Sequence, residues 1–328
     1  MNYADVVFGL SWGDEGKGKV ANYLAGSNNY THVARWNGGP NAGHTIFINE
    51  KKYKTHIIPC GVFHNIMSII GPNCVINIDK FYNELNYLKD NGFNTDLVKV
   101  SPKANVITED HIEYDKKFLY KKLGTTAQGI APCYADKMLR KGIRAKEVLE
   151  SKYIWDEDLD GATVLCEGAQ SFWLDINYGD YPHVTSSETL PYGACSLGFS
   201  PKKILAMYGI AKIYDTKSGV DPLFPDSLWK DKYLLKLAEI GQEYGSTTGR
   251  KRLVNWLRLD KLKYAIKISG ITTLIINKCD ILEELGVFRM IIEGAEINFP
   301  SLEDMQDYIR SDLANFCEVI FSSNELTV

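Results

Sequence analysis

The sequence lacks a surplus of charge of either sign. Its 37 lysine and arginine residues stand against 41 aspartate and glutamate residues, which gives the 328 residues a formal net charge of -4. A protein that grips nucleic acid as its main task needs a basic excess, so this balance argues against a nucleic-acid partner. The content of 45% hydrophobic and 24% charged residues is that of an ordinary globular protein and excludes disordered and fibrous classes.

The sequence also has no long apolar run and no secretory start. No uninterrupted apolar stretch approaches the roughly 20 residues that a membrane-spanning helix needs. Residues 1–5 lack the basic segment that opens a signal peptide. We therefore expect a cytoplasmic protein without a membrane partner, in the host cytoplasm if its source is viral.

Paired cysteines are a third absence. The seven cysteines are scattered and include no Cys-x-x-Cys pair, so the sequence predicts neither a disulfide framework nor a zinc site. We expect the thiols to be small buried hydrophobic groups.

Short apolar segments recur along the chain, separated by polar stretches of helical spacing such as 79–91 and 228–240. Nearly continuous apolar strands imply a sheet covered on both faces, hence a mostly parallel one. No low-complexity linker, charge block or repeat divides the chain. We therefore predict an α/β fold in a single large domain of residues 1–328, with a mostly parallel central sheet flanked by helices. The expected strands contain residues 6–8, 33–35, 67–70, 163–166, 203–208 and 273–276.

A glycine-rich segment, GDEGKGK at 13–19, lies where a predicted strand turns into a predicted helix. Successive glycines let backbone N–H groups point at an anion beside the positive end of the helix. The spacing satisfies Gly-x-x-x-x-Gly-Lys, but Val20 stands where such loops have the Ser or Thr that holds magnesium. We therefore predict a P-loop-like triphosphate site in which Asp14 supplies an oxygen to Mg²⁺.

Four further segments are dense in Gly, Asn, Thr, Gln and His, a composition suited to enclosing polar ligands. They are residues 37–45, 124–130, 167–170 and 245–250. With the first loop, the ordered motifs GDEGKGK, NAGHT, GTTxxGI, EGAQ, YPxVTSS and TTGR resemble those of the adenylosuccinate synthetase family, from about residue 6 to residue 280.

The resemblance implies a ligase reaction. L-Aspartate is joined to C6 of a 6-oxopurine nucleoside monophosphate through a 6-phosphoryl intermediate, with hydrolysis of a nucleoside triphosphate and with Mg²⁺. The C6 oxygen becomes a nucleophile when the N1 proton is removed, and it leaves only once phosphorylated. The family match makes Asp14 the base at N1, His44 the donor to the leaving diphosphate and Gln170 the holder of O6. The Gly43 carbonyl would join Asp14 at the metal.

The same resemblance implies the substrate-binding residues. For the triphosphate they are Gly13, Glu15, Gly16, Lys17, Gly18, Lys19, Gly43, Thr45, Asn277, Lys278 and Asp280. For the monophosphate substrate they are Asn41, Thr125, Thr126, Arg140, Gln170, Thr185 and Ser218. For L-aspartate, whose two carboxylates suit guanidinium groups, they are Thr247, Thr248, Arg250 and Arg252. Arg140 matches an arginine that reaches the neighbouring subunit's nucleotide, which implies a homodimer.

Residues 277–280, NKCD, follow a predicted strand and resemble the Asn-Lys-x-Asp element of guanine sites. A carboxylate accepts both N1–H and the 2-amino N–H of guanine, a pair that adenine lacks, so Asp280 favours GTP. The chain nevertheless ends in FSSNELTV, without the Gly-Pro-x-Arg segment that completes the family's guanine pocket. ATP or dATP therefore stays open as the donor.

The stretch beside the purine also departs from the family. Thr-Arg-Val-Gly-x-Gly-Pro is here TKSGVDP at 216–222, and Ser218 and Asp221 offer oxygens to a purine 2-amino group. The chain is short, like archaeal members and like the phage homologues that convert dGMP into 2-amino-2'-deoxyadenylosuccinate, the precursor of 2-aminoadenine in DNA. These features slightly favour a phage-type enzyme acting on (d)GMP over an ordinary enzyme acting on IMP with GTP. Asp14 argues the other way, because the best-known phage enzymes have serine there.

A guanine-nucleotide switch protein is the remote alternative. It would also carry a phosphate loop and Asn-Lys-x-Asp. The Asp-x-x-Gly segment at 158–161 precedes a predicted strand instead of following one, and a switch has no need of His44 or of the EGAQ motif.

Overall fold

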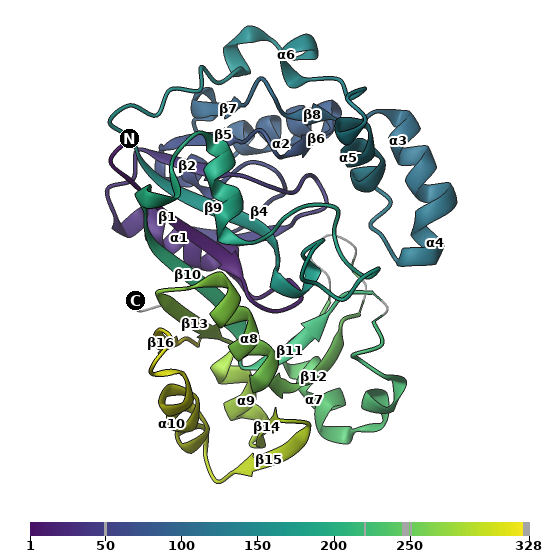
Figure 1. The fold of residues 1–328 in the computed structure, drawn as a ribbon, viewed down its shortest axis with the longest axis vertical. Coiled ribbons are helices and arrows are strands. Elements are labelled where there is room, and N and C mark those ends of the chain that lie inside the picture. The colour runs from purple at the N-terminus through teal and green to yellow at the C-terminus, as the bar shows by residue number, and fades with distance from the viewer. Residues whose placement is uncertain (49–50, 220, 245–248, 250, 324–328) are drawn as a thin grey trace.

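The computed structural model describes residues 1–48, 51–219, 221–244, 249 and 251–323. Within these residues, eight strands form a central sheet in the order β16-β13-β10-β1-β9-β2-β5-β7, and all neighbouring pairs are parallel (Figure 1). The predicted α/β fold with a parallel central sheet is confirmed. The strands are β1 (Tyr3–Gly9), β2 (His32–Arg35), β5 (Met67–Ile70), β7 (Val98–Val100), β9 (Thr163–Ser171), β10 (Ile204–Lys212), β13 (Thr273–Asn277) and β16 (Glu318–Phe321).

Apolar residues on both sides of the strands explain why this sheet is buried. Side chains alternate between faces along a strand, and both sets in β1 are apolar. Phe8 packs in a cluster that contains Leu274, whereas Val7 packs in another with Val20 and Leu24. Each face of the sheet therefore needs a cover of helices.

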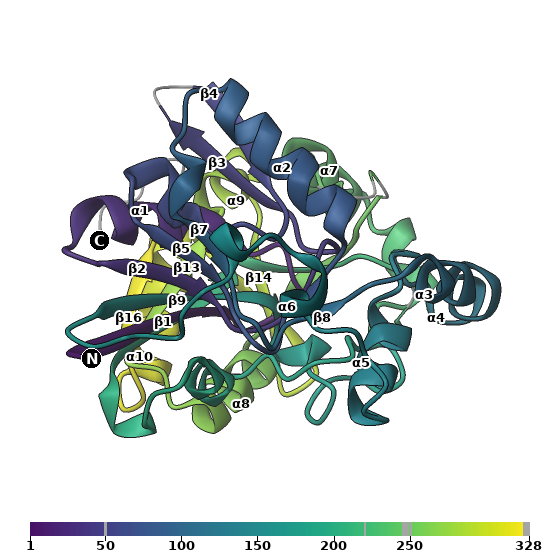
Figure 2. The same ribbon diagram turned by 90° about the horizontal axis from the view of Figure 1, so that it is seen from above.

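Helices lie on both faces of the sheet, and Figure 2 shows α1 and α8 on opposite sides of it. The helix predicted at 79–91 begins at Ile78, because the Asn77 side chain accepts the Lys80 N–H. The one predicted at 228–240 begins only at Lys232, because Asp231 caps it. The helices are α1 (Lys17–Ser27), α2 (Ile78–Asp90), α3 (Glu109–Tyr114), α4 (Tyr120–Leu123), α5 (Ile130–Met138), α6 (Ala145–Val148), α7 (Lys232–Ile240), α8 (Leu259–Ser269), α9 (Cys279–Leu285) and α10 (Leu302–Leu313).

A second sheet has the order β11-β12-β14-β15. Its residue Trp256 belongs to the same buried cluster as Phe8 of the central sheet. The single domain of residues 1–328 stays a prediction. The remaining strands are β11 (Tyr214–Lys217), β12 (Leu253–Arg258), β14 (Phe288–Ile292), β15 (Ala295–Phe299), the pair β3 (His44–Ile48) and β4 (Lys51–Thr55), and the pair β6 (Val75–Ile76) and β8 (Asn105–Val106).

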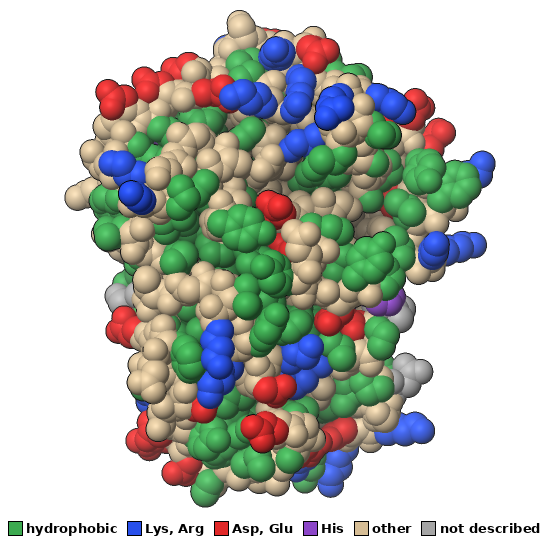
Figure 3. All heavy atoms as spheres, viewed as in Figure 1, with side chains coloured by type: hydrophobic (Ala, Val, Ile, Leu, Met, Phe, Trp, Pro, Cys, Tyr) green, Lys and Arg blue, Asp and Glu red, His purple; other side chains and the backbone are tan. Residues whose placement is uncertain are grey.

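The surface and the helices bear on the expected partners. In the described part of the chain, no helix is long and apolar enough to span a membrane. Figure 3 shows basic and acidic side chains interspersed over one face of the molecule. Five of the seven cysteines are buried, as expected, whereas Cys195 and Cys317 are only half-buried.

The parallel sheet also determines where a ligand site can form. Since its strands run in one direction, the segments that follow β1, β2, β9, β10 and β13 emerge at the same edge. In open α/β sheets this carboxyl edge is where ligands bind.

Candidate active site

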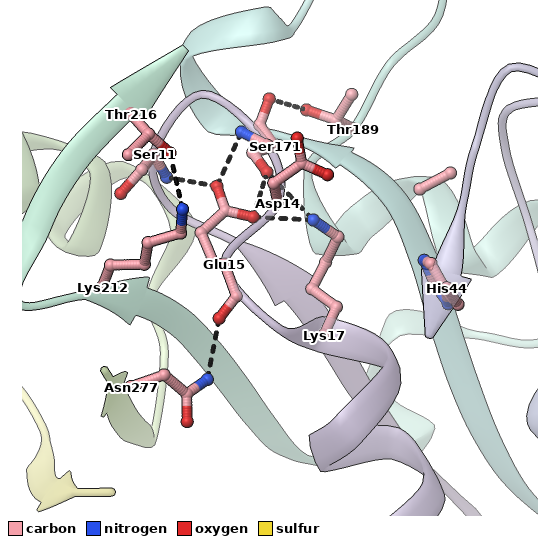
Figure 4. Close-up of polar contacts among 12 residues, drawn as sticks. Ser11, Asp14, Glu15, Lys17, His44, Ser171, Thr189, Lys212, Thr216 and Asn277 are labelled. Atoms are coloured by element: carbon pink, nitrogen blue, oxygen red, sulfur yellow. Dashed lines mark hydrogen bonds and ion pairs between the residues drawn. The ribbon is translucent and has the colours of Figure 1, made fainter. Parts of the chain in front are cut away.

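The phosphate loop connects β1 to α1 and folds around the carboxylate of Glu15. This carboxylate, 1% exposed, accepts hydrogen bonds from the Gly13 backbone N–H (2.8 Å), from Ser171 Oγ (2.8 Å) and from Lys17 Nζ (2.7 Å) (Figure 4). Burial alone would raise the pKa of Glu15, but the Lys17 ammonium and the hydrogen bonds hold it below its usual value. Lys17, predicted to face the triphosphate, is thus ion-paired with Glu15 inside the loop.

The Asn-Lys-x-Asp element follows β13, and its asparagine contacts this loop. Asn277 Nδ2 donates to the Glu15 carbonyl oxygen at 2.8 Å, so Asn277 tethers the phosphate loop to the end of β13. Lys278 adopts a left-handed conformation (φ 70°) just before α9. Asp280, in the first turn of α9, has a buried Oδ1 without a hydrogen-bond partner among the described residues. That oxygen is free to accept from a ligand.

Lys19 points away from the loop that it was predicted to serve. Its Nζ donates to the Ser323 carbonyl oxygen (2.7 Å) and lies 3.3 Å from Ser322 Oγ, at the end of β16. Burial lowers the pKa of Lys19, while Asp280 opposes the shift. Its ammonium therefore lies on the side of Asp280 instead of beside Glu15.

Asp14 is connected to the predicted aspartate loop through Arg252. Arg252 Nε donates to Asp14 Oδ2 at 2.8 Å, and Arg252 Nη1 donates to Glu243 Oε2 at 2.5 Å. Glu243 also accepts from Lys212 Nζ (3.0 and 3.1 Å) and from the Tyr214 hydroxyl (2.6 Å). Burial alone would raise the pKa of Glu243, but Lys212 and Arg252 lower it to about 2. Glu243 is thus the ionised centre of a network that orients Arg252 on Asp14.

His44 begins β3 directly beside the first turn of α1. A methyl group added at Gly18 would lie 2.8 Å from His44 Cβ, so glycine allows this close approach. Arg35 Nη2 lies 2.8 Å from His44 Nδ1 and 2.8 Å from Glu167 Oε1, and the carboxylate also contacts Nδ1. Burial and Arg35 lower the pKa of His44 to about 4, with Glu167 opposing. The imidazole is therefore neutral at neutral pH.

Figure 4 shows Asp14 on the phosphate loop and His44 on the separate strand β3, with the Lys17 side chain between them in this view. Thr45, also predicted at the triphosphate, follows His44 in β3 and is half-buried. The loop and the start of β3 are thus neighbouring parts of one edge of the sheet.

Two predicted purine-side residues present unused acceptors. The side-chain oxygens Gln170 Oε1 and Asn41 Oδ1 are buried and have no hydrogen-bond partner among the described residues. Asn37 locks their two loops together, since it donates to Ala169 O (3.0 Å) and accepts from Ala169 N (2.9 Å). Buried oxygens without partners are costly, which favours a ligand donor at this place.

The other residues predicted to bind the monophosphate substrate contact their own loops or lie at the surface. The Thr125 hydroxyl donates to Asp115 Oδ1 at 2.5 Å, so it organises its own loop. Thr185 donates its backbone N–H to Leu174 O at 2.8 Å, and Thr126 is half-buried. Ser218 and Arg140 are exposed.

The altered stretch at 216–222 has an internal explanation. Lys217 Nζ donates to Asp221 Oδ2 (2.5 Å) and to His183 O (2.9 Å), and Asp221 Oδ1 accepts the Leu223 N–H (2.8 Å). Both carboxylate oxygens of Asp221 are therefore engaged within the protein. These partners argue against the expectation that Asp221 offers an oxygen to a purine 2-amino group, which stays a prediction.

Three of the four predicted aspartate-binding residues, Thr247, Thr248 and Arg250, lie outside the described residues. A metal at Asp14 and Gly43 would find few protein ligands, because the described residues include no group of three or more His, Cys, Asp or Glu side chains suited to a metal. Mg²⁺ commonly takes one carboxylate, with substrate phosphates and water completing its shell. Asp14 fits that pattern, since its side chain is 27% exposed and only Oδ2 meets Arg252.

Several residues of this site were missed by sequence reasoning: Arg35, Asp115, Lys212, Tyr214 and Glu243. These five residues all lie outside the motifs quoted from the sequence.

Comparison with known proteins agrees with this geometry. The sequence matches the family described as adenylosuccinate synthetase over residues 6–160 and 150–300. The adenylosuccinate synthetase of Bacteroides fragilis is 37% identical over 354 aligned positions, covering 90% of this chain and 83% of the relative. That of Streptococcus gordonii is 36% identical over 344 positions, covering 88% and 79%.

Two solved structures are similar. Fully ligated adenylosuccinate synthetase from Plasmodium falciparum has a TM-score of 0.86 at 28% identity, covering 98% of this chain and 97% of that one. Succinoaminodeoxyadenylate synthetase of cyanophage S-2L, bound to dGMP and dATP, has a TM-score of 0.77 at 19% identity, covering 98% and 92%, and it shares the fold. From the family match, the bacterial relatives and the shared fold, it follows that the chain belongs to the adenylosuccinate synthetase family and is a ligase of that type.

Proposed function

We propose that the protein joins L-aspartate to C6 of IMP, with GTP as the phosphate donor. The observation that carries the choice of acceptor is the buried Lys217–Asp221 pair. Lys217 and Asp221 replace the arginine and the second glycine of the family's Thr-Arg-Val-Gly-x-Gly-Pro stretch. Since the two side chains form an ion pair with each other, these two changes are explained within the protein. The (d)GMP interpretation loses the support that it drew from Asp221, and the 36–37% identical relatives are named adenylosuccinate synthetase.

In this proposal Asp14 takes the N1 proton of the purine, so that O6 can attack the terminal phosphate of GTP. Arg252 orients the Asp14 carboxylate through the hydrogen bond from its Nε to Oδ2. Gln170, whose Oε1 is unused, and Asn41 meet the acceptor. The aspartate amino group then displaces the phosphorylated oxygen from C6, and inorganic phosphate leaves.

His44 acts on the departing diphosphate. In the unliganded protein its ring is neutral because it is buried beside Arg35. An approaching polyphosphate favours the protonated imidazole, while Glu167 at Nδ1 stabilises that cation. The ring can thus donate to the leaving oxygen as negative charge develops there.

Mg²⁺ would be held by Asp14, with the Gly43 carbonyl oxygen as second protein ligand. When bound, it neutralises charge on the phosphates that are transferred and released. For the donor base, the unpartnered Oδ1 of Asp280 supports guanine over adenine. The proposed homodimer places the exposed Arg140 at the partner's acceptor phosphate.

A steady-state assay with IMP, GMP and dGMP, each paired with GTP or ATP, tests this proposal. IMP with GTP should give the highest kcat/KM. A dGMP rate far above that of IMP would establish the phage-type specificity instead. GTP hydrolysis without aspartate and without a purine monophosphate would support the switch interpretation.

A further inference from the structure

A buried carboxylate lies in the π-helical turn Asp115–Leu119, which connects α3 to α4. Turns of this kind are rare and are frequent at functional sites. The buried side of the segment carries Ile112 and, three positions on, Asp115. Asp115 is 1% exposed, although an aspartate is seldom fully buried unless its charge has partners. Its partners therefore indicate why the chain keeps an acid at this position.

The Asp115 carboxylate bridges the two ends of the loop 124–129, which follows α4. Its Oδ1 accepts from the Thr125 hydroxyl at 2.5 Å, and its Oδ2 accepts from the Gly129 backbone N–H at 2.9 Å. Gly129 (φ 75°) lies so close to α3 that a methyl group there would be 2.9 Å from the Ile112 backbone nitrogen. One carboxylate thus fixes both the start of the loop and its junction with α5.

Two adjacent threonines in this loop have different surroundings. The Thr125 hydroxyl donates to Asp115 and also accepts the Ala127 N–H at 3.2 Å, so it is engaged within the protein. The second bond supports Ala127 in a left-handed conformation (φ 54°), which residues other than glycine seldom adopt. Among the described residues, the half-buried Thr126 has no hydrogen-bond partner. Thr126 is therefore the threonine that can meet a ligand.

The loop 124–129 lies between two segments that were predicted to meet the acceptor. One segment contains Gly219, where a methyl group would lie 3.8 Å from the Gly124 carbonyl oxygen. The other contains Gly39, where a methyl group would lie 3.1 Å from Ile130 Cδ1. Helices α3, α4 and α5, which flank the loop, lie together in Figures 1 and 2. The conformation of the loop therefore bears on the acceptor site.

We propose that Asp115 is a positioning residue for the acceptor's phosphate. It holds Thr125 and Gly129 so that Thr126 faces the phosphate oxygens. A carboxylate suits this task, because its two oxygens accept from two donors at once. The Thr125 hydroxyl, which the family resemblance assigns to the substrate, fixes the loop instead. This inference rests on the proposed function, since it requires a purine monophosphate in the site.

Steady-state kinetics with IMP as substrate and inosine as competitive inhibitor test the proposal. Inosine has the base and sugar of IMP without the phosphate. Asp115→Ala should raise the KM for IMP about tenfold or more, because the loop loses both bonds that orient it. The Ki of inosine and kcat should change by less than about twofold, because only binding of the phosphate is impaired. Asp115→Asn should restore most of the affinity, since its amide oxygen can accept the Gly129 N–H and its amide can donate to the Thr125 hydroxyl.

A double-mutant cycle tests whether Thr125 acts through the carboxylate. Thr125→Val should raise the KM for IMP about threefold or more. The double variant D115A/T125V should raise it by less than the product of the two single effects. Effects that multiply would show that the Thr125 hydroxyl contacts the substrate independently, and they would overturn the proposal. If Asp115→Ala does not fold, Asp115→Ser replaces it, because serine keeps an acceptor but cannot bridge both donors.

Asp136→Asn is the matched control. Asp136 of α5 lies 3.3 Å from His111 Nε2 of α3, so it joins the same two helices, and among the described residues it forms no hydrogen bond with the loop 124–129. Its KM for IMP should equal that of the unmodified protein.

An unchanged KM for IMP in Asp115→Ala would overturn the proposal. An equal rise in the KM for IMP and in the Ki of inosine would also overturn it, because Asp115 would then support the whole pocket and not the phosphate contact. Failure of the proposed function is distinguishable, since it appears in the unmodified protein as a lack of turnover with IMP. In that case GMP and guanosine replace IMP and inosine, and the variants are judged by the same criteria.

Discussion

Arg252 Nε donates to Asp14 Oδ2 at 2.8 Å, across 238 positions of sequence. This contact joins the phosphate loop to the loop predicted to close over L-aspartate. Glu243 in turn accepts from Arg252 Nη1, so the orientation of the proposed base depends on Glu243 as well. We expect the binding of aspartate and the activation of the purine to be coupled through this guanidinium group.

The roles of Asp14 and His44 predict a selective loss of chemistry. Asp14→Ala and His44→Ala should each lower kcat by about 10²–10⁴, the usual contribution of a general acid or base. Nucleotide binding should persist in both, because neither change removes the backbone N–H groups of the phosphate loop. Rapid-quench assays and equilibrium binding of GTP measure the two effects. Near-normal turnover in either variant would refute its assignment.

Gly18→Ala tests the packing of His44 against α1. The new methyl group would lie 2.8 Å from His44 Cβ and should displace the ring, lowering kcat by about 10-fold or more. Gly26→Ala is a matched control in the same helix, because its methyl would meet His64 Cε1, also at 2.8 Å. Both changes should cost about 1–3 kcal/mol of stability, but only the first should impair turnover. Equal activity of the two variants would contradict the close approach.

Glu243→Gln should destabilise the fold and disturb Asp14. Removing one partner of a buried ion pair costs about 3–5 kcal/mol, here because Lys212 loses its carboxylate. Since the pKa of Glu243 is lowered to about 2 from 4.5, its contribution is complete above pH 4.5 and is lost as the pH falls toward 2. The difference in unfolding free energy between the two proteins should therefore shrink below pH 4.5 in urea titrations.

The matched control for that experiment is Glu296→Gln, which removes a surface pair with Arg289. It should change the free energy of unfolding by less than about 1 kcal/mol at any of these pH values. An equally small effect of Glu243→Gln would show that the buried network is not what holds Arg252.

Asp280→Asn should relax the choice of donor base. The carboxylate accepts from guanine N1–H and from the 2-amino group, whereas an amide offers one acceptor and one donor. We expect kcat/KM for GTP to fall about 10- to 100-fold. The kcat/KM for xanthosine triphosphate, which has an oxygen at C2, should rise. An unchanged kcat/KM for GTP would show that the guanine ring does not contact Asp280.

Local patterns made much of the fold predictable. The apolar segments became β1, β2, β5, β9, β10 and β13, and the phosphate loop lies between β1 and α1. Helix α7 starts later than its apolar spacing suggests, because Asp231 caps it and residues 226–230 form a 3₁₀ turn. A single polar cap can therefore outweigh an apolar repeat.

The site was harder to predict because its contacts connect distant strands. Arg35 ends β2 and Glu167 lies in β9, and only the pairing of these strands brings both to His44. The folding of Glu15 back into its own loop likewise depends on Ser171 from β9. Motifs predicted the groups that would meet ligands, but spacing carries no information on which charged residues support them.

The central claim is that the C6 oxygen of the purine captures the terminal phosphate before aspartate enters. IMP labelled with ¹⁸O at C6, converted with GTP and aspartate, measures this directly by mass spectrometry of the products. The account predicts one ¹⁸O atom in each inorganic phosphate formed and none in the succinylated nucleotide at C6. Inorganic phosphate without the label would contradict it.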